Sequence, residues 1–378
     1  MRNQIRGRTR HMSTSPSRLA FYLPGLYDGG AERIILNLIK GIAAKGYLVD
    51  LVLARAEGPY MTEVPDAIRL IDLKAARVLS SVPALVRYLC QEQPGAVLSV
   101  LYANVPALWA KRVSGYRGRV IVSEHNTLSV VGSDTHDLRW QIFPQLAHWF
   151  YPWADDVIAV SQGVADDLAH VARLPRDRIQ VIYNPIVTSD LYEKSREPFE
   201  HPWFKAGEPP VVLAVGRLTA QKAFDRLINA FARIRARRSA RLLILGEGED
   251  RLALQNLVNQ LGLEQDVGMP GFVSNPYAYM AHAAALALSS RWEGLPTVLV
   301  EAMSLGVPVI STDCPSGPRE ILRDGEYGRL VPVGDSSALV EAISAALDGQ
   351  VPSAPQDSWK PFDLDTVIGQ YLEVLQGA

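Results

Sequence analysis

Two glutamates separated by seven residues, Glu293 and Glu301, have the spacing that says most about chemistry in this chain. Between them, Pro296 suits the first position of a helix, and Leu295 before it has no oxygen with which to cap that helix. The first N–H groups of the helix are therefore left to bind an anion. One carboxylate precedes this helix start and the other lies two turns inside it, so both can accept hydrogen bonds from hydroxyls beside a bound phosphate. A sugar, a phosphate and a ribose would fit in that order.

Two cations follow another predicted strand. Gly216 and Arg217 come directly after the apolar run 211–215, and Lys222 lies five residues further on. Ligands bind at the carboxyl ends of strands in open α/β sheets. Arg217 and Lys222 are thus candidates to hold a diphosphate and to stabilise the charge of a leaving group. The alternative is that both are solvated charges at a helix start, where without an anion they would be mildly unfavourable.

Glycine turns and one histidine complete the candidate set. Gly29 and Gly30 follow the first predicted strand and open a helix, so their backbone can approach a phosphate closely. Gly246 and Gly248 also follow a strand, but the third glycine of a dinucleotide fingerprint is replaced by arginine, which disfavours a Rossmann dehydrogenase. These turns could equally serve packing. His125 follows the predicted strand 120–122, and a lone histidine in such a place is often structural.

Apolar runs alternate with amphipathic helical patterns along the whole chain, which predicts two doubly wound α/β halves. The predicted strands are residues 19–23, 48–54, 96–100, 120–122 and 157–160 in the first half, and 211–215, 242–245, 284–288, 307–310 and 329–331 in the second. The predicted helices of the first half are residues 31–44, 81–91, 104–113, 138–150 and 162–171.

The expected domain organisation follows from these patterns. We expect a disordered basic tail over residues 1–18, an N-terminal Rossmann-like domain over 19–190 and a proline-rich linker over 191–210. A C-terminal Rossmann-like domain should span 211–360, and a closing helix within 361–378 should cross back to the first domain. The tail is arginine-rich; it could be a solvated extension, with Met12 the true start, or an arm that touches anionic lipid.

Composition excludes several classes. At 378 residues the chain can hold two full cores, and 48% hydrophobic with 21% charged residues is ordinary for a globular protein. A net charge of −2 disfavours nucleic acid as a partner. Two cysteines without metal-ligand spacing indicate neither a disulfide framework nor a metal site. No uncharged apolar run is long enough for a transmembrane helix.

Five motifs follow one another along this chain. They are residues 29–33 (Gly-Gly-Ala-Glu-Arg), 123–126 (Ser-Glu-His-Asn), 216–222, the glutamate pair, and 313–320 (Asp-Cys-Pro-Ser-Gly-Pro-Arg-Glu). In that order they resemble the motifs of glycosyltransferase family 4, whose members are retaining enzymes with the GT-B fold of two facing Rossmann-like domains. The resemblance implies that Glu293 lies beside the donor sugar and that Glu301 binds ribose hydroxyls. Arg217 and Lys222 would hold the nucleotide diphosphate in place of a metal, and His125 would reach the transferred sugar.

The same resemblance implies further donor contacts, chiefly through backbone groups. The loop at Gly29 and Gly30 would lie over the donor diphosphate or the acceptor. The remaining donor-binding residues that it implies are Gly216, Gly246, Gly248, Phe272, Val273, Gly294, Leu295, Pro296 and Thr297. The catalytic residues would be Glu293, His125, Arg217 and Lys222. No cofactor and no metal would be required; Asp363 and Asp365 mimic a metal-binding pair, but their place near a helix start favours capping.

The function that the resemblance implies is retaining transfer of an N-acetylhexosamine or hexose from a UDP-sugar to a saccharide acceptor. That acceptor would be polyprenyl-diphosphate-linked, and the enzyme peripheral on the cytoplasmic face of the inner membrane, in surface polysaccharide or glycan assembly. The aromatic stretch 140–154, without charge, is by default core and alternatively an amphipathic membrane contact. Two other functions stay open: a sugar-nucleotide epimerase with the same architecture, and a non-catalytic nucleotide-sugar-binding partner of another transferase.

Overall fold

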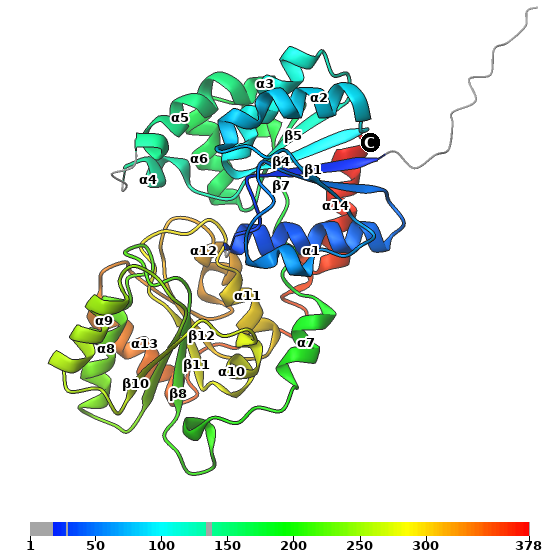
Figure 1. The fold of residues 1–378 in the computed structure, drawn as a ribbon. Helices are drawn as coiled ribbons and strands as arrows, with labels where there is room; N and C mark the ends of the chain where they lie inside the picture. Colours follow the sequence, from blue (N-terminus) through cyan, green and yellow to red (C-terminus); the bar gives the residue numbers. More distant parts are fainter. Residues whose placement is uncertain (1–17, 28, 134–137, 378) are drawn as a thin grey trace, which may run out of the picture.

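The computed structural model describes residues 18–27, 29–133 and 138–377, and these form two lobes, each built around one parallel sheet (Figure 1). In the described residues the N-terminal sheet has seven strands in the order β3-β2-β1-β4-β5-β6-β7. The C-terminal sheet has six, in the order β10-β9-β8-β11-β12-β13. Every strand pair is parallel, as doubly wound sheets require. The predicted α/β class with two such sheets is confirmed.

The N-terminal lobe takes its strands in chain order from the first half of the sequence. They are β1 (Leu19–Leu23), β2 (Val49–Leu53), β3 (Arg69–Asp72), β4 (Ala96–Val100), β5 (Arg119–Glu124), β6 (Asp156–Ala159) and β7 (Ile179–Val181). The helices are α1 (Gly30–Ala44), α2 (Val82–Glu92), α3 (Asn104–Ser114), α4 (Leu128–Ser133), α5 (Leu138–Phe150), the short η4 (Tyr151–Trp153), α6 (Gln162–Ala172) and, from the end of the chain, α14 (Leu364–Gln376).

The C-terminal lobe repeats the plan. Its strands are β8 (Val211–Val215), β9 (Arg241–Leu245), β10 (Val267–Gly271), β11 (Ala285–Leu288), β12 (Val309–Thr312) and β13 (Arg329–Val331). Its helices are α8 (Phe224–Arg235), α9 (Arg251–Gln260), α10 (Pro276–His282), α11 (Thr297–Ser304), α12 (Pro318–Ile321) and α13 (Ser336–Leu347).

Strand β1 shows how one sequence fills both faces of a sheet. Leu19, Phe21 and Leu23 pack in one buried cluster with α1, whereas Ala20 and Tyr22 pack in another with α2, α3 and α6. This alternation follows from the two-residue period of a strand. Helix α14 adds Ile368 and Tyr371, among others, to the first cluster, so the end of the chain lies against the beginning, as the red helix beside the blue one shows in Figure 1.

Two segments cross between the lobes, and they pair with each other. The amides of Ile186 and Val187 donate to the carbonyl of Phe362 at 2.9 and 3.0 Å, and Val187 and Asp363 form a parallel bridge. The predicted linker is not irregular throughout. Helix α7 (Ser189–Ser195), capped by Thr188, lies at its start and packs against α10.

Other differences from the sequence expectations are local. Arg18, assigned to the tail, donates to buried Asp50 at 2.6 Å and so belongs to the folded lobe; the rest of the predicted tail lies outside the described residues. Strands β3, β7 and β10 and helix α4 were not predicted. Pro296 is the N-cap of α11 rather than its first residue, because its ψ of 99° is extended.

Candidate functional site

The centre of the site is an ion pair between the two lengths of chain that follow β8 and β11. Lys222 Nζ donates to Glu293 Oε1 at 2.6 Å, and the hydroxyl of Ser290 donates to the same oxygen at 2.5 Å. Both ionic side chains are largely buried, at 17% and 7% exposure. Gln221 Nε2 donates to the carbonyl of Trp292 at 2.9 Å and ties the same two segments together. The structure therefore brings two predicted catalytic residues into direct contact.

Helix α11 begins beside this pair. Its N-cap, Pro296, makes no side-chain capping bond, and its first turn holds no acidic residue. Neither the cap residue nor an acid of the first turn therefore neutralises the positive end of the helix dipole at Thr297 and Val298. Leu295, before the cap, is buried. This is the helix start that the sequence predicts as an anion site.

Glycines let three turns at the carboxyl ends of β8, β9 and β10 lie against one another. A Cβ on Gly246 would stand 2.0 Å from the Gly216 carbonyl oxygen, and one on Gly248 would stand 2.3 Å from that of Leu218. A Cβ on Gly216 would stand 3.1 Å from Cε of Lys222, so this glycine makes room for the stem of the lysine. Packing alone thus accounts for these glycines, and their predicted role at the nucleotide stays a prediction.

Arg217 and Phe272 lie at the rim of these turns. Arg217 is exposed, and within the described residues its guanidinium has no ion-pair partner, whereas the ammonium of Lys222 is paired with Glu293. The side chain of Phe272 is 70% exposed, whereas Val273 is partly buried in the core. An exposed ring and a free guanidinium next to the buried pair are groups that a nucleotide could contact.

Glu301 faces the N-terminal lobe and has a partner that the sequence analysis did not assign. Arg33 Nη2 lies 3.5 Å from Glu301 Oε1, and its guanidinium lies 5.3 Å from the centre of the Tyr277 ring. Burial raises the pKa of the Glu301 carboxyl, and the nearby Arg33 opposes that rise. Arg33 stands in the same motif as Gly29 and Gly30, so the motif could have indicated it.

His125 lies at the end of β5, above a buried polar network. Burial lowers its pKa to about 4, so the ring is neutral near pH 7. Burial raises the pKa of the adjacent Glu124 to about 7. The Glu124 carboxylate accepts from the backbone amides of His125 and Asn126 at 3.0 and 3.2 Å and from the Tyr151 hydroxyl at 2.8 Å. These bonds fix the backbone that carries His125.

The two lobes are in contact at the loop that carries Glu293 and Gly294. A Cβ on Gly294 would stand 2.0 Å from the His125 carbonyl oxygen, so only glycine permits this approach. The Thr127 hydroxyl donates to the Glu293 carbonyl, and the Ser161 hydroxyl to the Gly294 carbonyl, each at 2.9 Å. The loop that carries Glu293 is therefore held from both lobes.

The loop at Gly29 and Gly30 differs from the expectation in its charge. Gly29 is the N-cap of α1, and a Cβ there would stand 2.1 Å from Oε2 of Glu32. A carboxylate thus already lies at the start of this helix. A diphosphate placed there would meet a like charge, which costs binding energy. The donor contact at Gly29 and Gly30 stays a prediction, and the carboxylate of Glu32 argues against it.

Three further observations bear on partners. Among the described residues, no group of three or more His, Cys, Asp and Glu side chains is arranged to hold a metal ion. Asp363 caps α14 by accepting from the Thr366 amide at 3.1 Å, which confirms its predicted capping role. In the described part of the chain, no helix combines the length and apolarity needed to span a bilayer.

Comparison with known proteins gives the family and the fold. Residues 28–190 match the family described as Glycosyltransferase Family 4, and residues 195–359 match Glycosyl transferases group 1. The N-acetylgalactosamine-N,N'-diacetylbacillosaminyl-diphospho-undecaprenol 4-alpha-N-acetylgalactosaminyltransferase of Campylobacter jejuni is 29% identical over 88% of this chain and 90% of its own. The amylovoran biosynthesis glycosyltransferase AmsD of Erwinia amylovora is 27% identical over 82% and 85%.

Solved structures agree on the architecture. The Anabaena protein HepE in complex with UDP superposes with a TM-score of 0.74 at 22% identity, over 96% of this chain and all of that one. The lipopolysaccharide outer core galactosyltransferase WaaB, in its apo form, gives 0.71 at 24% identity over 95% and 99%. The predicted GT-B fold is confirmed.

Proposed function

Since the chain belongs to glycosyltransferase family 4, whose retaining enzymes transfer a sugar from a nucleotide sugar, we propose that its donor is a UDP-sugar and its acceptor a polyprenyl-diphosphate-linked saccharide. The observation that carries the donor half is the uncapped start of α11 beside the Lys222–Glu293 pair. A diphosphate fits there, because helix N–H groups and a buried ammonium both favour an anion. Similarity to a fold that binds UDP in HepE supports the choice of nucleotide.

The donor contacts follow from this placement. The diphosphate lies at Thr297, with Lys222 on one side and Arg217 on the other. Glu301 accepts from the ribose hydroxyls, and Glu293 borders the sugar. These cations supply the positive charge that a metal supplies in other transferases, so we propose that the reaction needs no metal.

The transfer that this geometry supports proceeds on one face of the sugar. The bond between the anomeric carbon and the diphosphate oxygen breaks, and the acceptor hydroxyl attacks the anomeric carbon from the same side. The departing phosphate oxygen takes the proton of that hydroxyl, while Lys222, Arg217 and the α11 amides stabilise the charge of the diphosphate. His125 enters this site as a neutral ring, which can donate one hydrogen bond and accept another.

The acceptor half of the proposal has separate support. The Campylobacter relative is named as an enzyme that acts on a diphospho-undecaprenol-linked saccharide, and the match covers most of both chains. Such acceptors are made at the cytoplasmic face of the inner membrane, where the enzyme would be peripheral. The pathway that consumes the product is then surface polysaccharide or glycan assembly.

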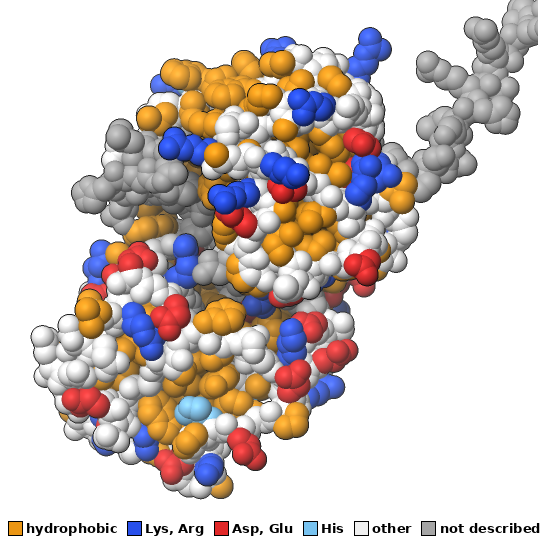
Figure 2. All heavy atoms as spheres, in the orientation of Figure 1, with side chains coloured by type: hydrophobic (Ala, Val, Ile, Leu, Met, Phe, Trp, Pro, Cys, Tyr) orange, Lys and Arg blue, Asp and Glu red, His pale blue; other side chains and the backbone are white. Residues whose placement is uncertain are grey.

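A surface of the N-terminal lobe suits contact with such a membrane. Figure 2 shows hydrophobic side chains with Lys and Arg among them on the upper part of the molecule, where Figure 1 places α2, α3 and α5. Trp149 is 61% exposed and Val113 72%, and Arg112 lies 4.9 Å from the centre of the Trp153 ring. Exposed aromatics and unpaired cations favour an anionic bilayer surface.

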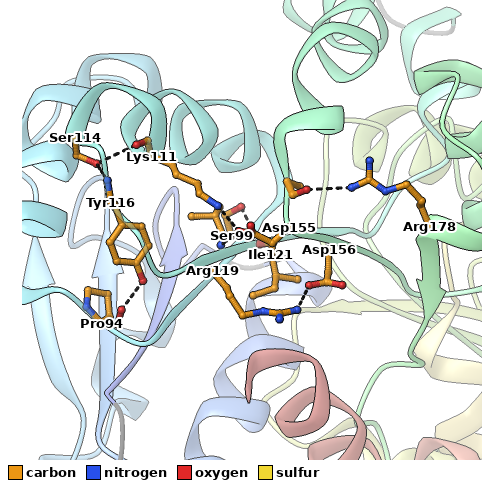
Figure 3. A network of polar contacts seen from close by, with 12 residues as sticks. Pro94, Ser99, Lys111, Ser114, Tyr116, Arg119, Ile121, Asp155, Asp156 and Arg178 are labelled. Carbon is orange, nitrogen blue, oxygen red and sulfur yellow. Dashed lines mark hydrogen bonds and ion pairs between the residues drawn. The ribbon is translucent and has the colours of Figure 1, made fainter. Parts of the chain in front are cut away.

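Two other cations of the N-terminal lobe, Lys111 and Arg119, have carboxylate partners and so do not add to this charge. Figure 3 shows Lys111 turned toward Asp155 and Arg119 toward Asp156, and both are ion pairs. The aromatic stretch itself is divided, because Phe143 and Tyr151 are core residues whereas Trp149 faces solvent. Arg112 and Arg117 are both exposed, so the proposed membrane contact rests on them and on the exposed rings of Trp149 and Trp153.

The test is nucleotide release from a panel of UDP- and GDP-sugars, with EDTA, in the presence and absence of detergent-solubilised bacterial membrane lipids. Lipid-dependent release of UDP from one donor is the expected result. Isomerised sugar without any acceptor would indicate an epimerase, and binding without turnover would indicate a partner of another transferase. Loss of release in EDTA, restored by Mg²⁺, would overturn metal independence alone.

A further inference from the structure

The segment from Pro315 to Glu320, which follows β12, touches the candidate donor site. The Pro315 carbonyl accepts from the Glu293 amide at 2.8 Å. Gly317 has a φ of 91°, and a Cβ there would stand 2.5 Å from Cδ of Pro296, the N-cap of α11. This segment therefore supports both the loop of Glu293 and the helix start that we assign to the diphosphate.

The other side of the same segment contacts the N-terminal lobe through Glu320. Its two carboxylate oxygens lie 2.9 and 3.0 Å from the amide nitrogen of Gln162, which donates to them, and the Tyr183 hydroxyl donates to Oε1 at 2.7 Å. Gln162 is the first residue of α6, so the carboxylate lies at the positive end of an eleven-residue helix. Burial and the bond to Glu320 raise the pKa of Tyr183 above its usual value, so it stays a donor.

Ser316 adds a second contact of the same kind. Its side-chain oxygen lies 3.1 Å from that of Ser161, the N-cap of α6. Ser161 accepts from the Val164 amide and donates to the Gly294 carbonyl, so the hydroxyl hydrogen between the two serines comes from Ser316. Ser316 has a φ of 111°, which is costly for a residue other than glycine. Such strain persists where surrounding contacts hold it.

We propose that Glu320 is a positioning residue that holds the two lobes together and, through residues 315–317, sets Glu293 and the start of α11 for transfer. It contacts no part of the donor as we place it; the proposal rests on the proposed function. The physical reason is that each bond of Glu320 described above joins the lobes, so these bonds stabilise only the arrangement in which the lobes meet. That arrangement excludes water from the donor.

The experiment compares Glu320→Gln with wild type in donor binding, transfer and donor hydrolysis. The substitution keeps the shape and removes the charge, so we expect the transfer kcat to fall about tenfold or more while the UDP dissociation constant changes less than about threefold. Hydrolysis of the donor relative to transfer should rise. An unchanged kcat, or a dissociation constant that weakens as much as kcat falls, would overturn the proposal.

Two further variants separate positioning from a general structural effect. Glu326→Gln makes the same chemical change on an exposed side chain nearby and should behave as wild type. Tyr183→Phe removes one of the hydrogen bonds, so it should lower kcat less than Glu320→Gln, and the double variant should fall no further than Glu320→Gln alone. Additive losses would contradict a shared contact.

A measurement independent of activity tests the same contacts. Small-angle X-ray scattering of the full chain with UDP should give a larger radius of gyration for Glu320→Gln than for wild type and Glu326→Gln. Equal radii would refute the holding role even if kcat falls. A wild-type protein that turns over no donor would refute the proposed function, whereas the scattering comparison would still decide the role of Glu320.

Discussion

The helices that begin at the junction of the lobes differ in what lies at their positive ends. In the N-terminal lobe, α1 has the Glu32 carboxylate beside its N-cap, and α6 has Ser161 and Glu320. In the C-terminal lobe, α11 has neither a capping side chain nor an acidic residue in its first turn, and the ion pair beside its start includes Lys222. The helix ends of the N-terminal lobe are thus satisfied within the protein, whereas the C-terminal lobe leaves one helix end for a ligand.

The largest effect should come from the cation of the ligand-binding lobe. Lys222→Met removes the ammonium that we place on the diphosphate, so turnover should fall by about 100-fold or more. The same change leaves the buried Glu293 without its counterion, which should lower the free energy of unfolding by about 3 kcal/mol. Steady-state kinetics and urea unfolding measure the two effects. Lys205→Met, at an exposed position, is the control, and normal turnover of a folded Lys222→Met protein would remove Lys222 from the site.

Two buried groups of the N-terminal lobe, His125 and Glu124, should make the stability of the protein depend on pH. His125, with its pKa lowered from 6.5 to about 4, binds a proton on unfolding, so it makes stability rise with pH across that interval. Glu124, with its pKa raised from 4.5 to about 7, releases one, so it makes stability fall with pH. In the wild type the two trends offset each other.

Single substitutions should separate these trends. As the pH rises from 4 to 6.5, the unfolding free energy of Glu124→Gln should increase by about 3 kcal/mol. As the pH rises from 4.5 to 7, the unfolding free energy of His125→Asn should decrease by a similar amount. Urea unfolding at several pH values measures both. The same pH slope in the two variants would show that these side chains are not buried as described.

A charge added at the open helix end should distinguish the two kinds of N-terminus. Thr297→Asp places a carboxylate in the first turn of α11, so it should weaken UDP binding about tenfold while stabilising the helix slightly. Glu32→Gln, at α1, should leave UDP binding unchanged. Calorimetric titration measures both, with Thr297→Asn as the neutral control. Weaker UDP binding by Glu32→Gln would move the diphosphate toward the Gly29 loop.

The smallest effect should come from Arg33, the cation that reaches across from the N-terminal lobe. Its ion pair with Glu301 is long, and a third of the Arg33 side chain is exposed, so Arg33→Gln should raise the donor KM only about two- to fivefold. Without Arg33 the pKa of Glu301 should rise further, and donor binding should need a higher pH. The pH dependence of KM measures this shift. An unchanged pH dependence would show that Arg33 does not act on the pKa of Glu301.

The sequence predicted the interior of each sheet better than its edges. Interior strands such as β1 and β4 are apolar at every position or nearly so, because helices cover both faces. The unpredicted strands β3, β7 and β10 are all at sheet edges, where Arg69, Gln180 and Pro270 interrupt the apolar pattern. Polar residues at an edge look like loop residues in a sequence.

The candidate site shows a similar division. Motif positions predicted Lys222 and Glu293, since each follows a recognisable strand. The contacts between lobes, such as Thr127 with Glu293 and Glu320 with Gln162, join residues more than 150 positions apart, and no local pattern encodes which of them meet. Glu320 and Arg33 lie inside motifs of the family, but their partners could be identified only from the fold.

Helix α14 has a consequence for the order in which the protein is made. Val367, Ile368 and Tyr371 lie in the same buried cluster as β1 and α1, which a ribosome releases first. The C-terminal sheet is then synthesised in full before these residues emerge. The part of α1 at Gly41, against which Ile368 packs, must therefore wait until nearly the last residue of the described chain has been added. The C-terminal lobe can complete its own core earlier, although its sequence comes second.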